Sequence, residues 1–338
     1  MTTNTVLLSA ETYPITGIPK GWPIGIDTGV TTDFSLISYG TCSFDVDWGD
    51  GNTETVDNVG PTTTFTTTHN YSTPGTYTVE ITLNSGDFRP YYNNNPAGGE
   101  LVTLADTPAG WSFGTDLSVS FTSAGITTIG NIDTSAVTNF ESAWNGCTSL
   151  ASFPLIDTSN GDNFFGTWRQ CSMTSFPPLD TSSGTNFDFT WQGSGLTSFT
   201  AIDLSSGTNF SYAWSFCTSM TSFPAFPADK RPVAATTFNR AWNICLNLAD
   251  FPANFFDNWT GTPANDCFTQ AWDICPKLTA TSVENILNSI DASGRSAPVS
   301  GFDIMVDYSV ATGTPNVATA VTNLKARGWT ITLNGVAQ

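Results

Sequence analysis

Large apolar residues recur at regular spacing along the chain between about residues 117 and 280. An aromatic residue returns every 23 to 30 residues, at Phe121, Trp144, Trp168, Trp191, Trp214, Trp242 and Trp272. Four residues before each of these lies a second apolar residue, at Leu117, Phe140, Phe164, Phe187, Phe210, Phe238 and Phe268. Repetition of this kind predicts units that cannot bury their apolar faces alone and therefore stack on one another.

Three further positions of each unit are periodic. A small residue follows the aromatic residue by three positions, at Ala124, Cys147, Cys171, Ser194, Cys217, Cys245 and Cys275. Next comes an aliphatic residue or methionine, at Ile126, Leu150, Met173, Leu196, Met220, Leu248 and Leu278, and then Ile129, Phe153, Phe176, Phe199, Phe223 and Phe251. The i, i+4 Phe–Trp pair predicts a short helical turn, and the L-x-x-F-P segment predicts a short strand.

The cysteine and tryptophan columns each have a structural and a chemical interpretation. Ala124 and Ser194 replace cysteine in its column, which favours a buried packing position over a redox or metal-binding one. The tryptophan column could form a sugar-stacking platform, but its pairing with phenylalanine four residues earlier favours a core position. The sequence therefore predicts reduced, buried cysteines and buried tryptophans.

The repeat unit has a recognisable signature, F-x-x-x-W-x-x-C-x-x-L-x-x-F, closed in the first four units by Asp133, Asp157, Asp180 and Asp203. Over residues 117–280 it resembles the BspA-like subclass of leucine-rich repeats. The resemblance implies a solenoid, and implies a surface or phage-borne protein in which such repeats often stand beside PKD domains. The chain departs from that pattern by Phe in place of Leu at most strand positions and by Ser194 in the cysteine column.

Short alternating segments precede the repeats. A strand is expected to begin around Phe34, and FDVDW (44–48) and YTVEITL (77–83) alternate apolar and polar residues between Gly and Pro turns. This pattern predicts a small β-sandwich. The segments DVDWGDG (45–51) and HNYSTPGTYTV (69–79) resemble the PKD domain, an immunoglobulin-like module, which implies a spacer or adhesion role without catalysis.

Three carboxylates cluster at the turn of that segment. Asp45, Asp47 and Asp50 offer hard oxygen ligands that suit calcium. The alternative is that Asp50 caps the turn while the other two face solvent. Calcium is the one cofactor that the sequence suggests.

The expected fold is a multidomain one: an all-β immunoglobulin-like sandwich followed by a leucine-rich-repeat solenoid with a small α/β C-terminal cap. The C-terminal segment is expected to form a helix at 282–290, a strand at 302–308, a helix ending at Gly328 and a strand at 329–333. The boundaries are an N-terminal arm (1–30), the sandwich (31–88), a connector with a strand at 101–104 (89–116), about seven repeats (117–280) and the cap (281–338).

Composition excludes several function classes. Of 338 residues only 10 are Lys or Arg against 29 Asp or Glu, which argues against nucleic-acid binding. An apolar run of about 20 residues, which membrane insertion requires, is absent from the sequence, and residues 1–17 do not resemble a signal peptide. His69 is the one histidine, which excludes the usual Cys/His zinc patterns and leaves Ser–His or Cys–His catalysis without a base outside the segment 69–79. We expect no enzyme.

A partner-contact surface is expected on the small residues beside the inward strand positions and on the longer inserts at 224–237 and 255–266. Its predicted members are Ser152, Pro154, Ser175, Pro177, Ser198, Thr200, Ser222, Pro224, Lys230 and Arg231.

Three functions fit these features. The first is a structural protein of a bacteriophage virion surface, a capsid decoration or a tail or fibre protein, anchored by its first 30 residues and assembled as an oligomer or on the particle. Its partners would be other virion proteins and a host surface glycan or protein. The second is a bacterial cell-surface adhesin, and the third is an accessory protein of a glycan-active enzyme.

Overall fold

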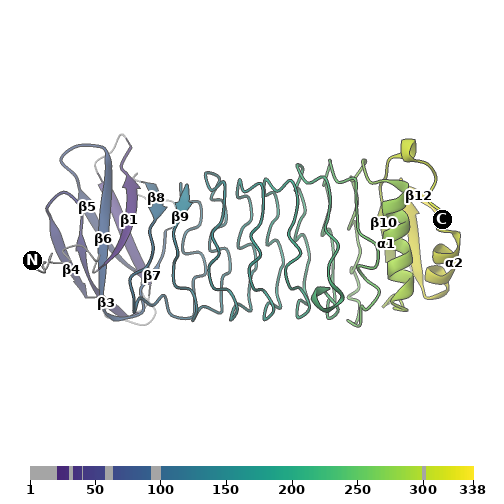
Figure 1. Ribbon diagram of the computed structural model, residues 1–338, viewed down its shortest axis with the longest axis horizontal. Coiled ribbons are helices and arrows are strands. Elements are labelled where there is room, and N and C mark those ends of the chain that lie inside the picture. The colour runs from purple at the N-terminus through teal and green to yellow at the C-terminus, as the bar shows by residue number, and fades with distance from the viewer. Residues whose placement is uncertain (1–20, 30–32, 40, 58–63, 93–99, 299–301) are drawn as a thin grey trace, which may run out of the picture.

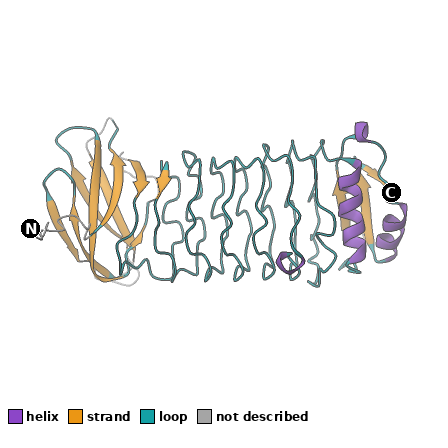
Figure 2. Ribbon diagram, viewed as in Figure 1, coloured by secondary structure: helices purple, strands orange, loops and turns teal. Residues whose placement is uncertain are grey.

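The computed structural model describes residues 21–29, 33–39, 41–57, 64–92, 100–298 and 302–338 (Figure 1). The molecule is elongated. A β-rich region lies at the N-terminal end, a row of stacked turns follows, and helices lie at the C-terminal end (Figure 2). Residues 1–20 of the expected anchoring arm fall outside the described residues.

Among the described residues, nine strands form the N-terminal region. They are β1 (Trp22–Asp27), β2 (Asp33–Tyr39), β3 (Cys42–Asp47), β4 (Thr53–Asp57), β5 (Thr64–Asn70), β6 (Thr76–Gly86), β7 (Arg89–Pro90), β8 (Glu100–Leu104) and β9 (Thr128–Ile129). One sheet has the order β4-β3-β6-β1-β8-β9 and the other β5-β2-β7. The strands expected around Phe34 and within 44–48, 77–83 and 101–104 are confirmed.

The six-stranded sheet extends beyond the segment predicted to form the sandwich. Residues 22–27, assigned to the arm, form β1, which pairs antiparallel with β6 and β8. The connector supplies β8, and the first repeat adds β9 in parallel to it. Trp22 of β1 is buried against Phe88 and Trp111, with ring centroids 6.3 and 5.2 Å away. The β region and the first repeat therefore share one core.

Each repeat is a loop of turns, which we call a rung and number 1 to 7 by Phe121, Trp144, Trp168, Trp191, Trp214, Trp242 and Trp272. Between β9 and β10 the described residues contain isolated parallel bridges, such as that between Asn163 and Asn186, but no extended strand. Alternate backbone N–H groups donate to the next rung: Phe140 N lies 2.8 Å from Asn163 O, and Trp144 N lies 3.0 Å from Thr167 O. Rung-to-rung hydrogen bonds thus form without strand geometry.

Left-handed residues explain this backbone. In each rung two equivalent residues have positive φ: the one two positions after the phenylalanine column and the one two positions after the tryptophan column. In rung 4 they are Phe189 (58°) and Gly193 (67°), and in rung 5 they are Tyr212 (55°) and Phe216 (61°). Neither a helix nor a strand admits a left-handed residue at every fourth position. The helical turn predicted for the Phe–Trp pair is therefore a series of turns.

The predicted fold class is wrong. An immunoglobulin-like sandwich followed by a leucine-rich-repeat solenoid requires a continuous sheet along the repeats. The strands instead form three small sheets, of six, three and three strands, and none of them forms a solenoid. The left-handed residues exclude the helical turn. Among the described residues, the predicted strand segments pair only through isolated bridges such as that between Ser198 and Ser222, in part because Pro154, Pro177 and Pro224 lack the backbone N–H that a continuous ladder requires.

Three aromatic columns hold the rungs together. Tryptophan rings stack between rungs 2 and 7 at centroid distances of 5.1 to 6.2 Å. The column that begins at Phe140 stacks at 5.1 to 5.7 Å. The third column inserts edge-on between tryptophans; the ring of Phe199, for example, lies 4.8 Å from that of Trp191 and 5.4 Å from that of Trp214. The prediction that the tryptophans form core is confirmed, since all six are fully buried.

The C-terminal elements cover rung 7. They are α1 (Ala280–Ala292), β10 (Phe302–Val306), a 3₁₀ turn (Val310–Thr312), α2 (Ala318–Ala326), β11 (Trp329–Leu333) and β12 (Val336–Ala337). The predicted order of helix, strand, helix and strand is confirmed. Thr279 caps α1 by accepting from Ser282 N, and the ring of Trp329 lies 5.6 Å from that of Phe268. Within the described residues, no helix has the length and apolar character to cross a bilayer.

Candidate functional site

The three aspartates proposed for calcium each have a different protein partner. Asp45 accepts from the Thr55 hydroxyl at 2.7 Å, and Asp47 accepts from Gly49 N at 2.9 Å. Asp50 accepts from Asn52 and contacts His69 Nε2 at 2.8 Å. Hydrogen bonding by His69 and Asn52 lowers the pKa of Asp50. Asp50 thus stabilises the turn, and Asp45 and Asp47 are exposed, as in the alternative interpretation.

Within the part of the chain that the structure describes, no group of three or more His, Cys, Asp or Glu side chains has an arrangement that would hold a metal ion. His69 is itself fixed by packing. Its ring stacks on Trp48 at 5.0 Å and lies edge-on to Tyr71 at 4.6 Å. The hydroxyl of Tyr71 donates to Trp48 O at 2.9 Å, so histidine, tryptophan and tyrosine together fix this turn.

The predicted contact strip lies partly at the surface. Its serines in rungs 2 to 4 are exposed, whereas its other members are half-buried: Pro154, Pro177, Thr200, Ser222, Pro224, Lys230 and Arg231. Ser198, Ser222 and Asp250 are linked by parallel bridges, and the Thr200 hydroxyl donates to Phe176 O at 2.5 Å. The strip is thus a hydrogen-bonded edge of the stack that carries small side chains.

The two inserts behave differently. Lys230 ends a short 3₁₀ turn (Ala228–Lys230), and Arg231 Nε donates to Phe226 O at 3.2 Å. In the second insert Phe255, Phe256 and Trp259 are buried and extend the aromatic core. The aromatic residues of that insert thus enlarge the core, while Asn258, Thr260 and Asp266 of the same insert are exposed.

The cysteines are free and buried, as predicted. Burial raises the pKa of Cys147 and Cys275 to about 12 and that of Cys217 to about 11. The reactive thiolate is therefore scarce at neutral pH. The three thiols each donate to a carbonyl oxygen of the preceding rung, and the Cys217 thiol also contacts the Ser194 hydroxyl. The cysteine column therefore links neighbouring rungs by hydrogen bonds as well as by packing.

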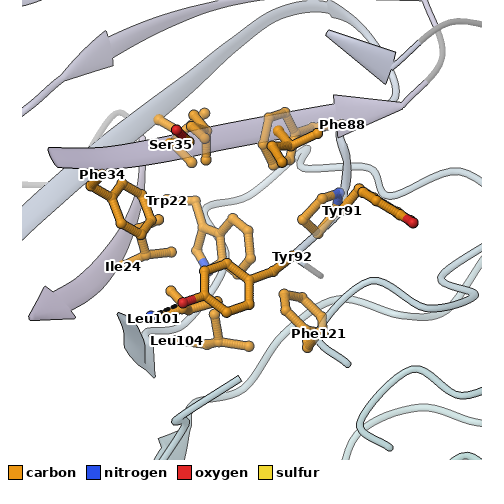
Figure 3. Close-up of a pocket in the computed structure, with 14 residues that line it drawn as sticks. Trp22, Ile24, Phe34, Ser35, Phe88, Tyr91, Tyr92, Leu101, Leu104 and Phe121 are labelled. Atoms are coloured by element: carbon orange, nitrogen blue, oxygen red, sulfur yellow. Dashed lines mark hydrogen bonds between the residues drawn. The ribbon is translucent and has the colours of Figure 1, made fainter. Parts of the chain in front are cut away.

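An apolar cavity lies where the two N-terminal sheets meet the first rung (Figure 3). Trp22, Phe34, Tyr92 and Phe121 line it, together with aliphatic side chains, and its volume is about 20 Å³. The Tyr92 hydroxyl accepts from Leu101 N at 3.1 Å, the Ser35 hydroxyl contacts that of Thr68 at 2.7 Å, and Trp22 Nε1 donates to Ala105 O at 3.0 Å, so these polar groups already have partners. The cavity holds at most one water molecule and is a packing gap, not a ligand site.

A larger groove opens on the outer face of the rungs. Its volume is about 340 Å³, and its walls are Arg169, Gln170, Gln192, Gly193 and Phe216. Gln170, Gly193 and Phe216 occupy the same position, two residues after the tryptophan, in rungs 3, 4 and 5. Because Gly193 has no side chain, it leaves a gap one rung wide between Gln170 and Phe216.

Beside the groove, aromatic and cationic side chains form a column on the outer face of the rungs. The ring of Phe189 stacks on Tyr212 at 4.5 Å, and the Arg169 guanidinium lies 5.4 Å from the Phe189 ring centroid. Arg240 continues the column; it donates to the Tyr212 hydroxyl and to Gln270, each at 2.6 Å. The inward columns of the sequence carry no information about this face, so it was not predicted. Aligning the outward positions would have found it.

Comparisons with known proteins add no assignment, since no family model, no curated protein and no solved structure matches the chain.

Proposed function

We propose that this chain is a non-enzymatic structural and adhesion protein of a bacteriophage virion surface, a capsid decoration or a tail or fibre protein. In this proposal its rungs form a stiff rod whose outer faces contact a partner protein or glycan.

One observation carries the proposal: the aromatic core is continuous along the long axis. Hydrophobic contacts run from Trp22 in the N-terminal sheets through every rung to Trp329 at the far end. A core that passes through every rung resists bending at any single rung, because bending would separate stacked rings. Such a rod suits the display of a surface at a distance from an anchor.

The chemistry of the chain supports assembly inside a reducing compartment. Its seven cysteines are free and buried, and a protein folded in the cytoplasm keeps such thiols reduced. A virion protein folds there and leaves the cell by lysis. The net charge of -19 supports solubility on an exposed particle.

The test is mass spectrometry of virions purified by density gradient from the host that carries the gene. We expect peptides of this chain to co-sediment with infectious particles at a constant ratio to the major capsid protein. Recovery in the host cell-surface fraction, with none in the particles, would contradict the proposal and favour the adhesin.

A further inference from the structure

We propose that the groove between rungs 3 and 5 binds a pyranose that carries a carboxylate, such as a hexuronic acid. This inference deepens the proposed function by naming a ligand class for the outer face of the rod. Five residues line the groove, and Phe189 lies beside it.

Gln192 supplies a polar group without a protein partner. The residue is only 9% exposed, and its side-chain amide makes no hydrogen bond with another described residue. Its counterparts in the next two rungs, Ser215 and Asn243, each donate to a carbonyl oxygen of the following rung at 3.2 Å. The amide atoms of Gln192 reach the solvent of the groove and have no protein partner among the described residues, so they are free to hydrogen-bond a ligand that enters it.

Arg169 supplies the charge. Its guanidinium rests on the Phe189 ring, and Nε is buried without a hydrogen-bond partner in the described residues. Arg240, at the neighbouring position of the outer face, is instead held by Tyr212 and Gln270. A guanidinium that stacks on an aromatic ring and keeps its donors free is arranged for the two oxygens of a carboxylate.

Phe216 supplies an apolar wall. Its ring is 46% exposed, on a rung whose other large apolar side chains are buried. The C–H face of a pyranose packs on such a ring, while vicinal hydroxyls face the amides of Gln170 and Gln192, which both donate and accept. A peptide carboxylate would use Arg169 but would leave the two amides and the ring without complementary groups, so the sugar is favoured.

The volume of the groove suits one sugar residue. About 340 Å³ lies at the lower end of the range of roughly 300–1,000 Å³ for small-molecule sites. The space exists because Gly193 has no side chain, whereas the neighbouring rungs carry Gln170 and Phe216 at the same position. Gln170 and Phe216 adopt the same left-handed conformation (φ 58° and 61°), so the fold accepts a non-glycine residue at this position.

Binding is tested by saturation-transfer NMR and calorimetry on the full chain with methyl β-D-glucuronide. Methyl β-D-glucoside is the neutral sugar control, and N-acetylaspartate is the acidic control without a sugar ring. We expect roughly millimolar binding of the glucuronide, with saturation transfer to its ring protons. Binding of the glucoside and of N-acetylaspartate should each be weaker by roughly tenfold or more.

Matched variants locate the site. Arg169→Gln should weaken glucuronide binding by roughly tenfold or more, whereas Arg231→Gln, which removes a cation outside the groove, should not change it. Phe216→Ala should weaken binding, whereas Ile274→Ala, the same position in rung 7 with 44% exposure, should not. Gly193→Asn should block the groove and keep the four other lining side chains, with circular dichroism to confirm folding.

The proposal is overturned if the folded wild-type protein does not bind glucuronide at tens of millimolar, if Arg169→Gln and Gly193→Asn bind as wild type, or if N-acetylaspartate binds equally well. These measurements use the isolated protein. Failure of sugar binding therefore leaves the virion assignment untouched, and absence from virions leaves sugar binding untouched.

Discussion

The thiol of Cys171 donates a hydrogen bond to the backbone carbonyl oxygen of Trp144, with 3.1 Å between Sγ and O. The same bond recurs along the stack, from Cys217 to Trp191 and from Cys245 to Trp214, at 3.2 Å each. Cysteine at this position is therefore both a small buried group and a donor that links neighbouring rungs.

The first prediction compares two replacements of Cys171. Cys171→Ala removes the donor and a buried sulfur, so we expect a loss of about 1–2 kcal/mol in the free energy of unfolding. Cys171→Ser keeps a donor, and Ser194 occupies the same position naturally at 3% exposure. The serine variant should therefore lose less stability. Urea denaturation followed by circular dichroism measures both, and a larger loss for serine would contradict the donor role.

The second prediction concerns thiol reactivity. Burial raises the pKa of Cys171 and Cys245 well above the ordinary value, and raises that of Cys42 as well. Native protein at pH 8 should therefore react with a thiol reagent far more slowly than free cysteine. After unfolding in guanidinium, all seven thiols should react at once. Rapid reaction of several thiols in the native protein would show that the rungs open readily.

The third prediction tests the third aromatic column, which inserts edge-on between tryptophans, at Phe199. Its ring lies edge-on to Trp191 and Trp214 and stacks on Phe223 at 5.8 Å. Phe199→Ala should cost about 3–5 kcal/mol, because it leaves a cavity between two stacked indoles. Phe199→Leu, the control, keeps most of the volume and should cost clearly less. Thermal denaturation and near-ultraviolet circular dichroism of the tryptophans give the comparison, and equal losses would argue against a packing role.

Inward periodicity allowed the rungs to be located from the sequence. Residues such as Phe140 and Trp144 recur because each rung must bury the same positions, and both are fully buried. The backbone between them could not be predicted. Phe189 and Tyr212 have positive φ, a conformation that propensity reserves mainly for Gly and Asn, and it is imposed here by stacking on neighbouring rungs. The helical turns predicted within the repeats failed for this reason.

The groove was missed for a different reason. It depends on outward positions and on a missing side chain at Gly193, and inward periodicity carries no information about either. For the candidate cation site, by contrast, the sequence suggested a site. Asp45, Asp47 and Asp50 are close in sequence, but each carboxylate has its own protein partner. Proximity along the chain indicated a shared ligand where the fold provides three separate hydrogen bonds.

The fourth prediction follows for calcium. Because the three carboxylates already accept protein hydrogen bonds, millimolar calcium chloride should leave the melting temperature unchanged, as should a chelator. Asp50→Asn should lower stability without calcium, because it weakens the contact to His69. A calcium-dependent rise in melting temperature that Asp50→Asn abolishes would contradict this prediction and support a calcium site at these carboxylates.

The last prediction uses the carboxyl group of Asp188. Burial raises its pKa from 3.8 to about 6, and the amide of Asn209 offsets this only in part. One carboxyl oxygen, Oδ1, is buried without a hydrogen-bond partner in the described residues. The folded state therefore holds the proton more tightly than the unfolded state does. The stability contributed by protonated Asp188 is complete below about pH 4 and is lost as the pH rises through 6.

Asp188→Asn should consequently stabilise the protein at pH 7. A shift of this size corresponds to between two and three kcal/mol for a fully buried group, and half-burial with solvent screening reduces the expected gain to about 1 kcal/mol. The gain should shrink from pH 7 to pH 5 and vanish near pH 4, because the wild-type carboxyl is then neutral. Asp229→Asn, at an exposed position, makes the same change in net charge and should give no pH-dependent gain. Urea denaturation at four pH values measures the difference; a gain independent of pH would mean that the asparagine acts by packing and not by removing a buried charge.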